Sequence, residues 1–400
     1  MDRFGDKICC NPTVKLKKQE SYPVIDIDKI TPGYKAVRSV ASIEYTGQGG
    51  AKFQDHDVLF ARITPCLENG KMAIADTEGQ NGIGSTELFV FRGIDGVSDT
   101  DYVYYLLCMK HIRQLAANSM TGASGRQRAD LDFIKRIQWD FPDIEMQKKI
   151  ASVLSAYDNL IEVNNKRVKV LELMAENLYK EWFVRFRFPG HEKADFENGI
   201  PKGWAYRRAD EVIDFNPTLK TGNQTEFTII PMEALSTNSM VLDSGCFVRQ
   251  DSISGRRSQN SDTLLAKITP CLENGKSGFV MGMPENEVLG GSTEFVVMRS
   301  KALTPHYVYC IARSYYFRQT AILSMNGADG RQRVDEDKLK STKILQPEKT
   351  VLDHFETIVT PIFDGVYQMV QENKNLIQQR DLLLPRLMSG KLEVQYALND

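Results

Sequence analysis

The sequence predicts an α+β fold made of two strand-rich α/β globular domains that alternate with two long α-helices. The helices are expected to form an antiparallel coiled coil, so that a pseudo-two-fold axis relates the two halves. Two observations support this prediction. The eight residues TPCLENGK occur twice, from Thr64 and, 205 positions later, from Thr269, and an apolar heptad pattern follows each globular half. Because this spacing is close to half of the 400 residues, we interpret the whole chain as an internal repeat.

Further segments repeat at the same or nearly the same spacing. MTGASGRQRAD from Met120 corresponds to MNGADGRQRVD from Met325, and GSTE occurs at Gly84 and again at Gly291. Glycine, asparagine and proline are retained at turns for structural reasons. Turn geometry does not explain why charged residues of these segments are also identical, so both copies are expected to do the same kind of work.

Each globular half is expected to consist mainly of β-strands. Short apolar runs of strand-forming residues occur at Val58-Leu59-Phe60, Phe89-Val90-Phe91, Thr263-Leu264-Leu265 and Phe295-Val296-Val297. One helix is predicted in each half, over Asp101–Ala116 and Pro305–Thr320.

The two long helices are predicted from apolar residues spaced alternately by three and four positions, which is the heptad pattern of a coiled-coil seam. Arg380 weakens the second seam, and Pro361 is expected to start or kink that helix. The seam residues are Ile150, Leu154, Tyr157, Ile161, Asn164, Val168, Leu171 and Leu178 in the first helix, and Phe355, Val359, Ile362, Val366, Met369, Asn373, Leu376, Leu383 and Leu387 in the second.

These patterns divide the chain into four segments. The globular domains are predicted at 1–142 and 189–346, a central spacer helix at 143–188 and a C-terminal spacer helix at 347–400. The aromatic and basic end of the central helix, Trp182–Phe186, is interpreted either as core or as a docking surface for a partner.

The composition excludes several classes of protein. The net charge of −2 argues against a wholly basic nucleic-acid coat, although local basic loops remain compatible with it. The chain has no apolar run long enough to cross a membrane and no apolar N-terminal signal segment, so a cytoplasmic location is expected. Seven cysteines without a CxxC pair indicate reduced thiols, and five widely scattered histidines argue against a zinc site.

Five segments together resemble the specificity subunit of a type I DNA restriction-modification system (the HsdS family). They are Pro201–Trp204 (PKGW), Leu264–Lys276 (LLAKITPCLENGK), Gly291–Glu294 (GSTE), Gln147–Leu154 (QKKIASVL) and Leu384–Leu392 (LPRLMSGKL). One of these segments, PKGW, has no counterpart in the first half of the chain.

The resemblance implies a division of labour between subunits. Each globular domain would be a target-recognition domain that binds one half of a bipartite double-stranded DNA site, and the helices would set the distance between the halves. Two modification subunits would carry S-adenosylmethionine and methylate adenine, and up to two restriction subunits would use ATP and Mg²⁺. This chain would itself be non-catalytic and would bind no cofactor.

The candidate DNA-binding residues fall into two groups. Identical loops cannot distinguish different half-sites, so residues in the repeated segments are expected to bind phosphate or to form a shared framework. Base recognition is expected where the copies differ. The repeated group is Arg62, Lys71, Arg126, Gln127, Arg128, Lys267, Lys276, Arg331, Gln332 and Arg333, and the divergent group is Lys15, Lys17, Lys220, Arg256 and Arg257.

Other interpretations of these residues stay open. The Gly-Arg-Gln-Arg loops are also compatible with solvated turns, or with internal clasps between arginine and Asp130 or Asp335, and TPCLENGK with a purely structural hairpin. A coiled-coil adaptor without DNA recognition is the alternative function. A methyltransferase is disfavoured because Asn11-Pro12-Thr13 lacks the second proline and the aromatic residue of an adenine-binding loop. PCLENGKS is a chance match to a P-loop, because proline occupies the first glycine position.

Overall fold

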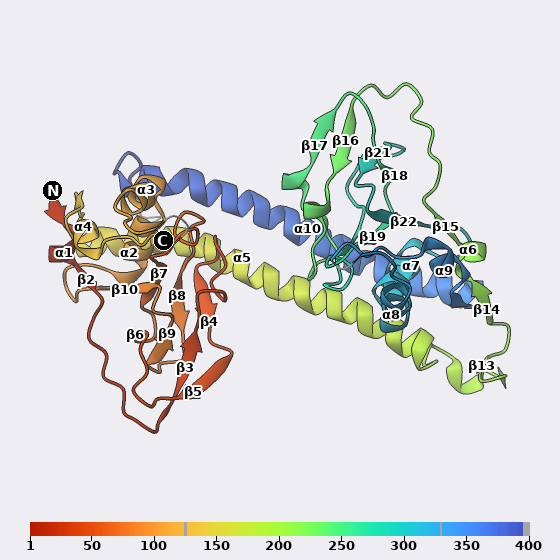
Figure 1. Ribbon diagram of the computed structural model, residues 1–400, viewed down its shortest axis with the longest axis horizontal. Helices are drawn as coiled ribbons and strands as arrows, with labels where there is room; N and C mark the ends of the chain where they lie inside the picture. The colour runs from red at the N-terminus through yellow and green to blue at the C-terminus, as the bar shows by residue number, and fades with distance from the viewer. Residues whose placement is uncertain (124–125, 329, 395–400) are drawn as a thin grey trace, which may run out of the picture. The chain divides into compact units, whose positions relative to one another are not determined.

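The computed structural model describes residues 1–123, 126–328 and 330–394 and divides into two compact units. Unit 1 comprises Met1–Val163 and Asn373–Asp400, and unit 2 comprises Asn164–Glu372. The long helices α5 (Ile144–Tyr179) and α10 (Lys349–Met388), yellow-green and blue in Figure 1, each contribute one part to each unit. Each unit therefore contains part of both long helices, and the division of the chain into four segments stays a prediction.

Unit 1 contains a five-stranded sheet in the order β2-β10-β7-β8-β4 and a four-stranded sheet in the order β5-β3-β9-β6. A two-stranded sheet pairs β1 with β11. The strands are β1 (Asp2–Arg3), β2 (Ile8–Cys10), β3 (Ser21–Ile25), β4 (Ala36–Arg38), β5 (Ala41–Glu44), β6 (Ala51–Phe53), β7 (Val58–Ala61), β8 (Met72–Asp76), β9 (Gly82–Gly84), β10 (Leu88–Gly93) and β11 (Gln138–Trp139). The short helices are α1 (Phe4–Lys7), α2 (Thr100–Cys108), α3 (Lys110–Asn118) and α4 (Leu131–Lys135).

Unit 2 repeats most of this topology, with sheets in the orders β15-β22-β19-β20, β17-β16-β21-β18 and β14-β23. Among the described residues its first sheet has no strand corresponding to β4, and β12 pairs with β13 in a further two-stranded sheet. The predicted internal repeat is therefore present in the pairing of the strands. They are β12 (Phe196–Glu197), β13 (Ile200–Pro201), β14 (Ala205–Arg208), β15 (Ile213–Phe215), β16 (Phe227–Ile230), β17 (Val248–Gln250), β18 (Arg256–Ser258), β19 (Thr263–Ala266), β20 (Ser277–Phe279), β21 (Leu289–Gly291), β22 (Phe295–Ser300) and β23 (Lys343–Gln346). The helices are η1 (Lys180–Val184), η2 (His191–Lys193), α6 (Ala209–Val212), η3 (Met232–Ala234), η4 (Ser244–Cys246), α7 (Pro305–Arg313), α8 (Tyr315–Leu323) and α9 (Glu336–Ser341).

The central strands are buried on both faces, which explains why their sequences are almost continuously apolar. In β7, Val58 and Phe60 join the core beneath α2, whereas Leu59 joins the core shared with the second sheet. Successive side chains of a strand point to opposite faces, so one apolar run serves two cores. In unit 2, Leu265 and Leu264 of β19 divide between two cores in the same way.

Each predicted short helix is in fact a pair of helices. Between α2 and α3 the backbone of Met109 is extended (φ −62°, ψ 128°), and between α7 and α8 Ser314 is extended in the same manner (φ −61°, ψ 145°). The hydroxyl of Ser314 accepts a hydrogen bond from the Phe317 N–H, so it caps the new helix. The single-helix prediction was wrong because a helix can restart after one extended residue without a proline or glycine.

Within each unit, α5 and α10 pack against each other in antiparallel directions. In unit 1, Leu154 shares a core with Leu384 and Leu387. In unit 2, Asn164 donates to Glu372 (3.0 Å), and Trp182 packs on Phe355. All the predicted seam residues are buried or half-buried. Pro361 lies inside α10, twelve residues after its first residue Lys349, so it does not start that helix.

The aromatic end of the central helix belongs to the core of unit 2. Trp182 and Phe183 are buried in η1, and Phe183 packs edge-on against Tyr307 (4.5 Å between ring centroids). Trp204, from the PKGW segment, is buried against Phe183 and Phe188. Of the two interpretations of Trp182–Phe186, the core one therefore holds for Trp182 and Phe183.

Candidate nucleic-acid interface

The two repeated loops, TPCLENGK and Gly-Arg-Gln-Arg, lie against each other in both units. In unit 1 the Thr64 N–H donates to the Gln127 carbonyl (3.0 Å), and the Ala129 N–H donates to the Arg62 carbonyl (2.8 Å). In unit 2 the Thr269 N–H donates to the Gln332 carbonyl (3.0 Å). Segments far apart in sequence thus form one structural element, and it is built in the same way twice.

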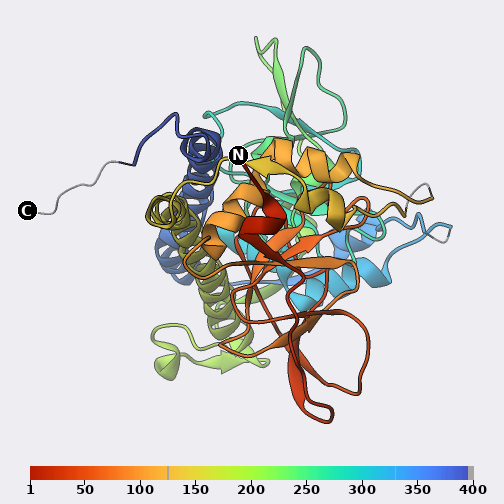
Figure 2. The same ribbon diagram turned by 90° about the vertical axis from the view of Figure 1, so that its left-hand side faces the viewer.

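Residues 126–128 and 330–333 form the second arm of a narrow hairpin in units 1 and 2, respectively. Thr121 and Arg128 exchange backbone hydrogen bonds (3.0 and 2.9 Å), as Asn326 and Arg333 do (2.9 Å each). At Gly122 the backbone φ is 123°, a conformation that other residues rarely adopt. Figure 2 shows the hairpin of unit 2, whose described residues are light blue, projecting from the body of that unit.

A carboxylate from the GSTE segment clasps the last arginine of each hairpin. Arg128 donates through Nε and Nη2 to both oxygens of Glu87 at 2.6–3.1 Å, and Arg333 binds Glu294 in the same way at 2.8–3.1 Å. The hydrogen bonds from Arg128 lower the pKa of Glu87, and those from Arg333 lower the pKa of Glu294. Such two-pronged contacts between arginine and carboxylate fix orientation as well as add energy.

The alternative interpretation, an internal clasp between arginine and Asp130 or Asp335, therefore names the wrong acid. The carboxylate of Asp130 accepts from the Asp132 N–H (2.8 Å) and caps α4, and Asp335 caps α9 by accepting from the Asp337 N–H (3.1 Å). Aspartate immediately before a helix satisfies free backbone donors at its start. The arginine partner is instead a glutamate 41 positions away in unit 1 and 39 positions away in unit 2.

The first arginine of each loop is placed differently from the last. Arg126 and Arg331 are exposed, and within the described residues no hydrogen bond or ion pair engages their guanidinium groups. Gln127 and Gln332 are half-buried and contribute backbone carbonyls to the contact with the TPCLENGK turn. The exposed pair can therefore reach a ligand without breaking a contact of the fold.

The other cations of the repeated segments are engaged with the protein. Lys71 donates to the Ile27 carbonyl (2.9 Å) and Lys276 to the Met232 carbonyl (3.3 Å), so both ammonium groups tie neighbouring loops to the turn. The guanidinium of Arg62 lies over the Phe89 ring, 4.7 Å from its centroid. These positions support a structural part for the TPCLENGK turn.

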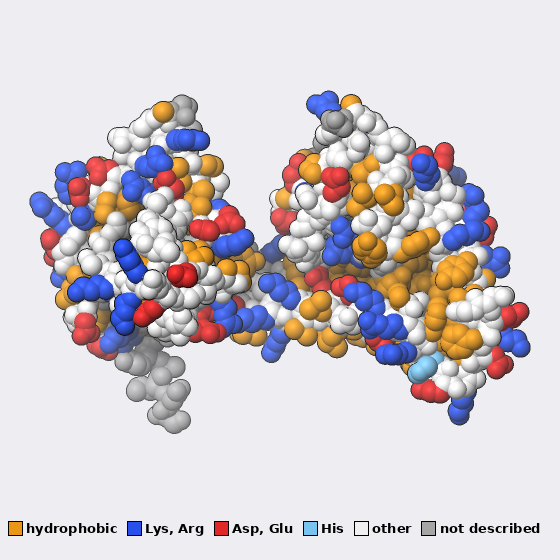
Figure 3. All heavy atoms as spheres, turned by 60° about the horizontal axis from the view of Figure 1, so that its bottom comes forward, with side chains coloured by type: hydrophobic (Ala, Val, Ile, Leu, Met, Phe, Trp, Pro, Cys, Tyr) orange, Lys and Arg blue, Asp and Glu red, His pale blue; other side chains and the backbone are white. Residues whose placement is uncertain are grey.

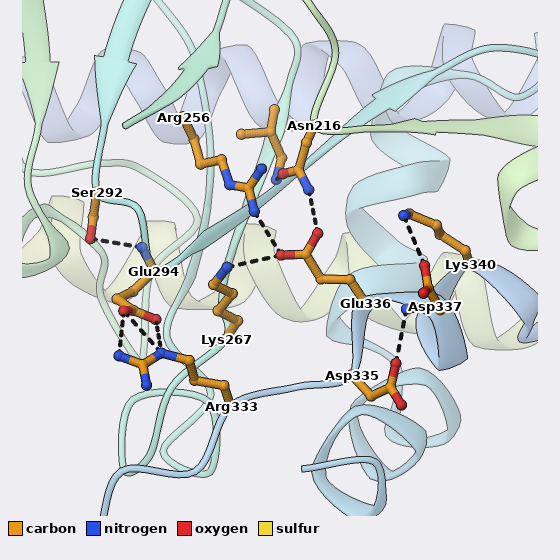
Figure 4. A network of polar contacts seen from close by, with 11 residues as sticks. Asn216, Arg256, Lys267, Ser292, Glu294, Arg333, Asp335, Glu336, Asp337 and Lys340 are labelled. Atoms are coloured by element: carbon orange, nitrogen blue, oxygen red, sulfur yellow. Dashed lines mark hydrogen bonds and ion pairs between the residues drawn. The ribbon is translucent and has the colours of Figure 1, made fainter. Parts of the chain in front are cut away.

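A cluster in unit 2 surrounds Glu336 at the first residue of α9. Arg256 and Lys267 donate to its Oε1 (2.7 and 2.8 Å), and Asn216 donates to its Oε2 (2.8 Å). Figure 4 shows these three side chains converging on the carboxylate, beside the Arg333–Glu294 clasp. The positions 205 residues before Arg256, Lys267, Asn216 and Glu336 are Ala51, Arg62, Asn11 and Leu131, respectively. Unit 1 therefore has no counterpart of Arg256 and no counterpart of the acid Glu336.

The sequence is similar to known proteins of one kind. Residues 8–173 match the family described as the type I restriction modification DNA specificity domain. The chain is similar to type I restriction enzyme specificity subunits over most of its length. It is 25% identical over 319 residues to the MjaIX specificity subunit of Methanocaldococcus jannaschii, which covers 76% of this chain and 72% of that protein. It is 22% identical to the MjaVIII specificity subunit of the same organism, over 98% of this chain and 92% of the other.

The fold of the chain also has a counterpart among solved structures. The S subunit of the type I system from M. genitalium superposes with a TM-score of 0.54, at 14% identity over 96% of this chain and 94% of that one. This likeness concerns the fold, which combines sheets with long helices.

The remaining predicted residues take no part in the two clasps. Lys15, Lys17 and Lys220 are exposed, and Lys17 pairs loosely with Glu20 (3.5 Å). Arg257 directs Nη1 to the Leu219 carbonyl. Figure 3 shows lysine and arginine side chains interspersed with acidic ones on the face that it presents, which fits the small net charge.

Sequence reasoning missed Glu87, Glu294 and Glu336. The sequence did contain a signal for Glu336. The two copies differ at this position, with leucine at 131 and glutamate at 336, and they also differ at the position of Arg256, where the first copy has Ala51. Among the described residues there is no helix long and apolar enough to cross a bilayer, and no group of three or more His, Cys, Asp or Glu side chains placed to hold a metal ion.

Proposed function

We propose that this chain is the DNA-recognition subunit of a type I restriction-modification complex and binds a bipartite duplex site, with one half-site held by each unit. The observation that carries the proposal is the hairpin that occurs in both units. Each presents one exposed arginine on a frame made rigid by a Glu–Arg clasp. Arginine binds phosphate and guanine with paired donors, and identical contacts in two copies suit the sequence-independent DNA backbone.

The names of the relatives support the same proposal. Proteins similar over most of this chain are called specificity subunits of type I restriction enzymes. In such a complex S-adenosylmethionine would belong to two modification subunits, and ATP with Mg²⁺ to restriction subunits. This chain would provide recognition without catalysis, in the cytoplasm where chromosomal DNA is accessible.

The long helices offer a surface for the modification subunits. On α5, apolar residues are exposed at Leu160 in unit 1 and at Leu173 and Met174 in unit 2. Neighbouring exposed apolar side chains such as Leu173 and Met174 can form part of a protein-protein contact. Leu173→Glu with Met174→Glu is expected to abolish co-purification with the modification subunit, whereas Lys169→Glu on the same helix is a control for added charge.

A selection experiment tests the central proposal. The purified full-length chain is mixed with duplexes of random sequence, and the bound fraction is amplified and sequenced over several rounds. Two short specified elements at a fixed separation are expected to emerge. A coiled-coil adaptor without DNA recognition, the alternative function, would enrich no sequence.

A further inference from the structure

We infer that Arg256, oriented by Glu336, recognises a guanine in the half-site bound by unit 2, and that unit 1 has no equivalent recognition because Ala51 and Leu131 occupy the same places. The inference rests on the proposed function and assigns one determinant of its specificity. Arg256 would contact the base, and Glu336 would be a positioning residue.

The strand register makes the comparison between the units direct. Arg256 of β18 pairs with Gly291 of β21, and Ala51 of β6 pairs with Gly84 of β9. Both glycines begin the GSTE segment, whose glutamate clasps the hairpin arginine in each unit. Arg256 and Ala51 thus stand at the same place on the same frame, and a difference there can distinguish two half-sites.

Arg256 keeps enough free donors for a base. A guanidinium has five N–H groups, and recognition of guanine O6 and N7 uses two of them. Among the described residues Arg256 gives only Nη2 to the protein, at 2.7 Å from Glu336 Oε1. Arg333 differs, because both Nε and Nη2 are committed to Glu294.

Glu336 is itself held in place. Its Oε2 accepts from Asn216 Nδ2 (2.8 Å), and Asn216 Oδ1 accepts from the Val297 N–H of β22 (3.0 Å). A continuous chain of hydrogen bonds therefore runs from the central sheet to the guanidinium. Support of this kind fixes the orientation of a contacting group before the ligand arrives.

The cluster is open to a ligand on one side. The side chains of Arg256 and Glu336 remain 30% and 24% exposed. In unit 1, where position 131 is leucine, Arg62 has no acid at the equivalent place and stacks on Phe89 instead. Arginine and glutamate are thus present together in one unit and absent together from the other. The methyl group of Ala51 suits an apolar contact such as the thymine methyl, not guanine.

The random-duplex selection with the full-length chain tests this inference when variants are run beside the wild type. Arg256→Lys retains the positive charge but loses the two-pronged donor geometry. We expect it to reduce the preference for guanine at one position of one half-site by about ten- to a hundredfold, and to leave the other half-site unchanged. Glu336→Ala should reduce the same preference, and Glu336→Gln, which keeps an acceptor oxygen, should restore part of it. Asp337→Ala, which removes only a contact with Lys340 (3.1 Å), is the matched control.

The outcomes separate the inference from the proposed function. If the wild type enriches no bipartite site, the proposed function fails. If the wild type does so, but Arg256→Lys retains the complete consensus, or weakens binding to all duplexes equally, Arg256 does not recognise a base. Retention of the guanine by Glu336→Ala would refute the positioning role. Melting temperatures of all variants separate loss of recognition from loss of fold.

Discussion

Arg380 of α10 and Asp158 of α5 form a buried ion pair in unit 1, with side chains only 10% and 4% exposed. The Tyr105 hydroxyl donates to the same aspartate, and Arg380 also donates to the Gly33 carbonyl (3.2 Å). The position that looked like a flaw in the heptad seam therefore joins both helices to the globular part of unit 1. Burial lowers the pKa of Arg380, but Asp158 outweighs that effect, so the net shift is upward.

Removing one partner of this pair should destabilise unit 1. Arg380→Met leaves a buried carboxylate without its cation, which typically costs about 3–5 kcal/mol. Hydrogen exchange of the full-length chain should show faster exchange in unit 1 peptides, with little change in unit 2. Arg386→Met, an exposed arginine on the same helix, is the control. The double variant Asp158→Leu with Arg380→Met should cost less than Arg380→Met alone, and an additive loss would contradict this account.

The two arginines of each hairpin should have separable effects. Arg331→Ala is expected to weaken DNA binding at an unchanged melting temperature, and to lower the slope of log affinity against log salt concentration by about one, because one phosphate contact is lost. Arg333→Ala should instead release Glu294 and increase hydrogen exchange in the hairpin. If Arg331→Ala left both affinity and salt slope unchanged, the hairpin would not contact DNA.

Unit 1 should lose some stability above neutral pH. His56 Nε2 lies 3.4 Å from Asp101 Oδ2, and this hydrogen bond raises the pKa of His56 above 6.5. The contribution of the protonated His56 to the free energy of unfolding is fully present below pH 6.5 and is lost as the pH rises through the higher pKa of the folded state. The difference in melting temperature between wild type and His56→Gln should therefore shrink from pH 6 towards pH 9. A constant difference would rule out the charged pair.

The same carboxylate predicts an acid limit. Burial raises the pKa of Asp101, but the hydrogen bond from His56 and the charge of Lys35 outweigh it and lower the value to about 2. Because the pKa of Asp101 is lower in the folded state, the ionised carboxylate stabilises the fold at pH values above its unfolded pKa of 3.8. This stabilisation is lost as the pH falls towards 2. Asp101→Asn should lose this part of the acid dependence of hydrogen exchange in unit 1. Identical profiles for Asp101→Asn and wild type would contradict the assignment.

The length of the helices should set the separation of the half-sites. Deleting one heptad from each helix, residues 161–167 and 366–372, removes about 10 Å of helix, equal to about three base pairs. Site selection should return the same two elements with a gap shorter by about three. An equal deletion in α5 alone should disturb the pairing and reduce binding. An unchanged gap after the paired deletion would exclude the helices as the spacer.

The sequence predicted the repeated architecture because its signals are local. Apolar runs such as 58–60 and 89–91 alternate between two cores, and the heptads of α5 and α10 persist over long stretches. Contacts between distant segments were not predictable in the same way. Nothing local connects Glu87 to Arg128, and Arg380 looked unfavourable because its partner Asp158 lies 222 positions away.

The sequence predicted which loops carry the candidate site, but it did not predict what each residue of those loops does. The pattern identified the hairpin arginines, but it could not separate exposed Arg126 from clasped Arg128, since both are charged residues in the same loop. Comparison of the two copies could have identified Glu336, because Leu131 and Ala51 diverge together from Glu336 and Arg256. Divergence between repeats is therefore a signal for specificity, whereas identity marks the common frame.

Sequencing of modified bases across the genome of the organism, with and without this gene, tests the central claim most directly. We predict a bipartite motif with modified adenines in both half-sites, a fixed number of unspecified base pairs between them, and complete loss of that modification when the gene is deleted. Retention of every methylated motif in the deletion strain would contradict the account.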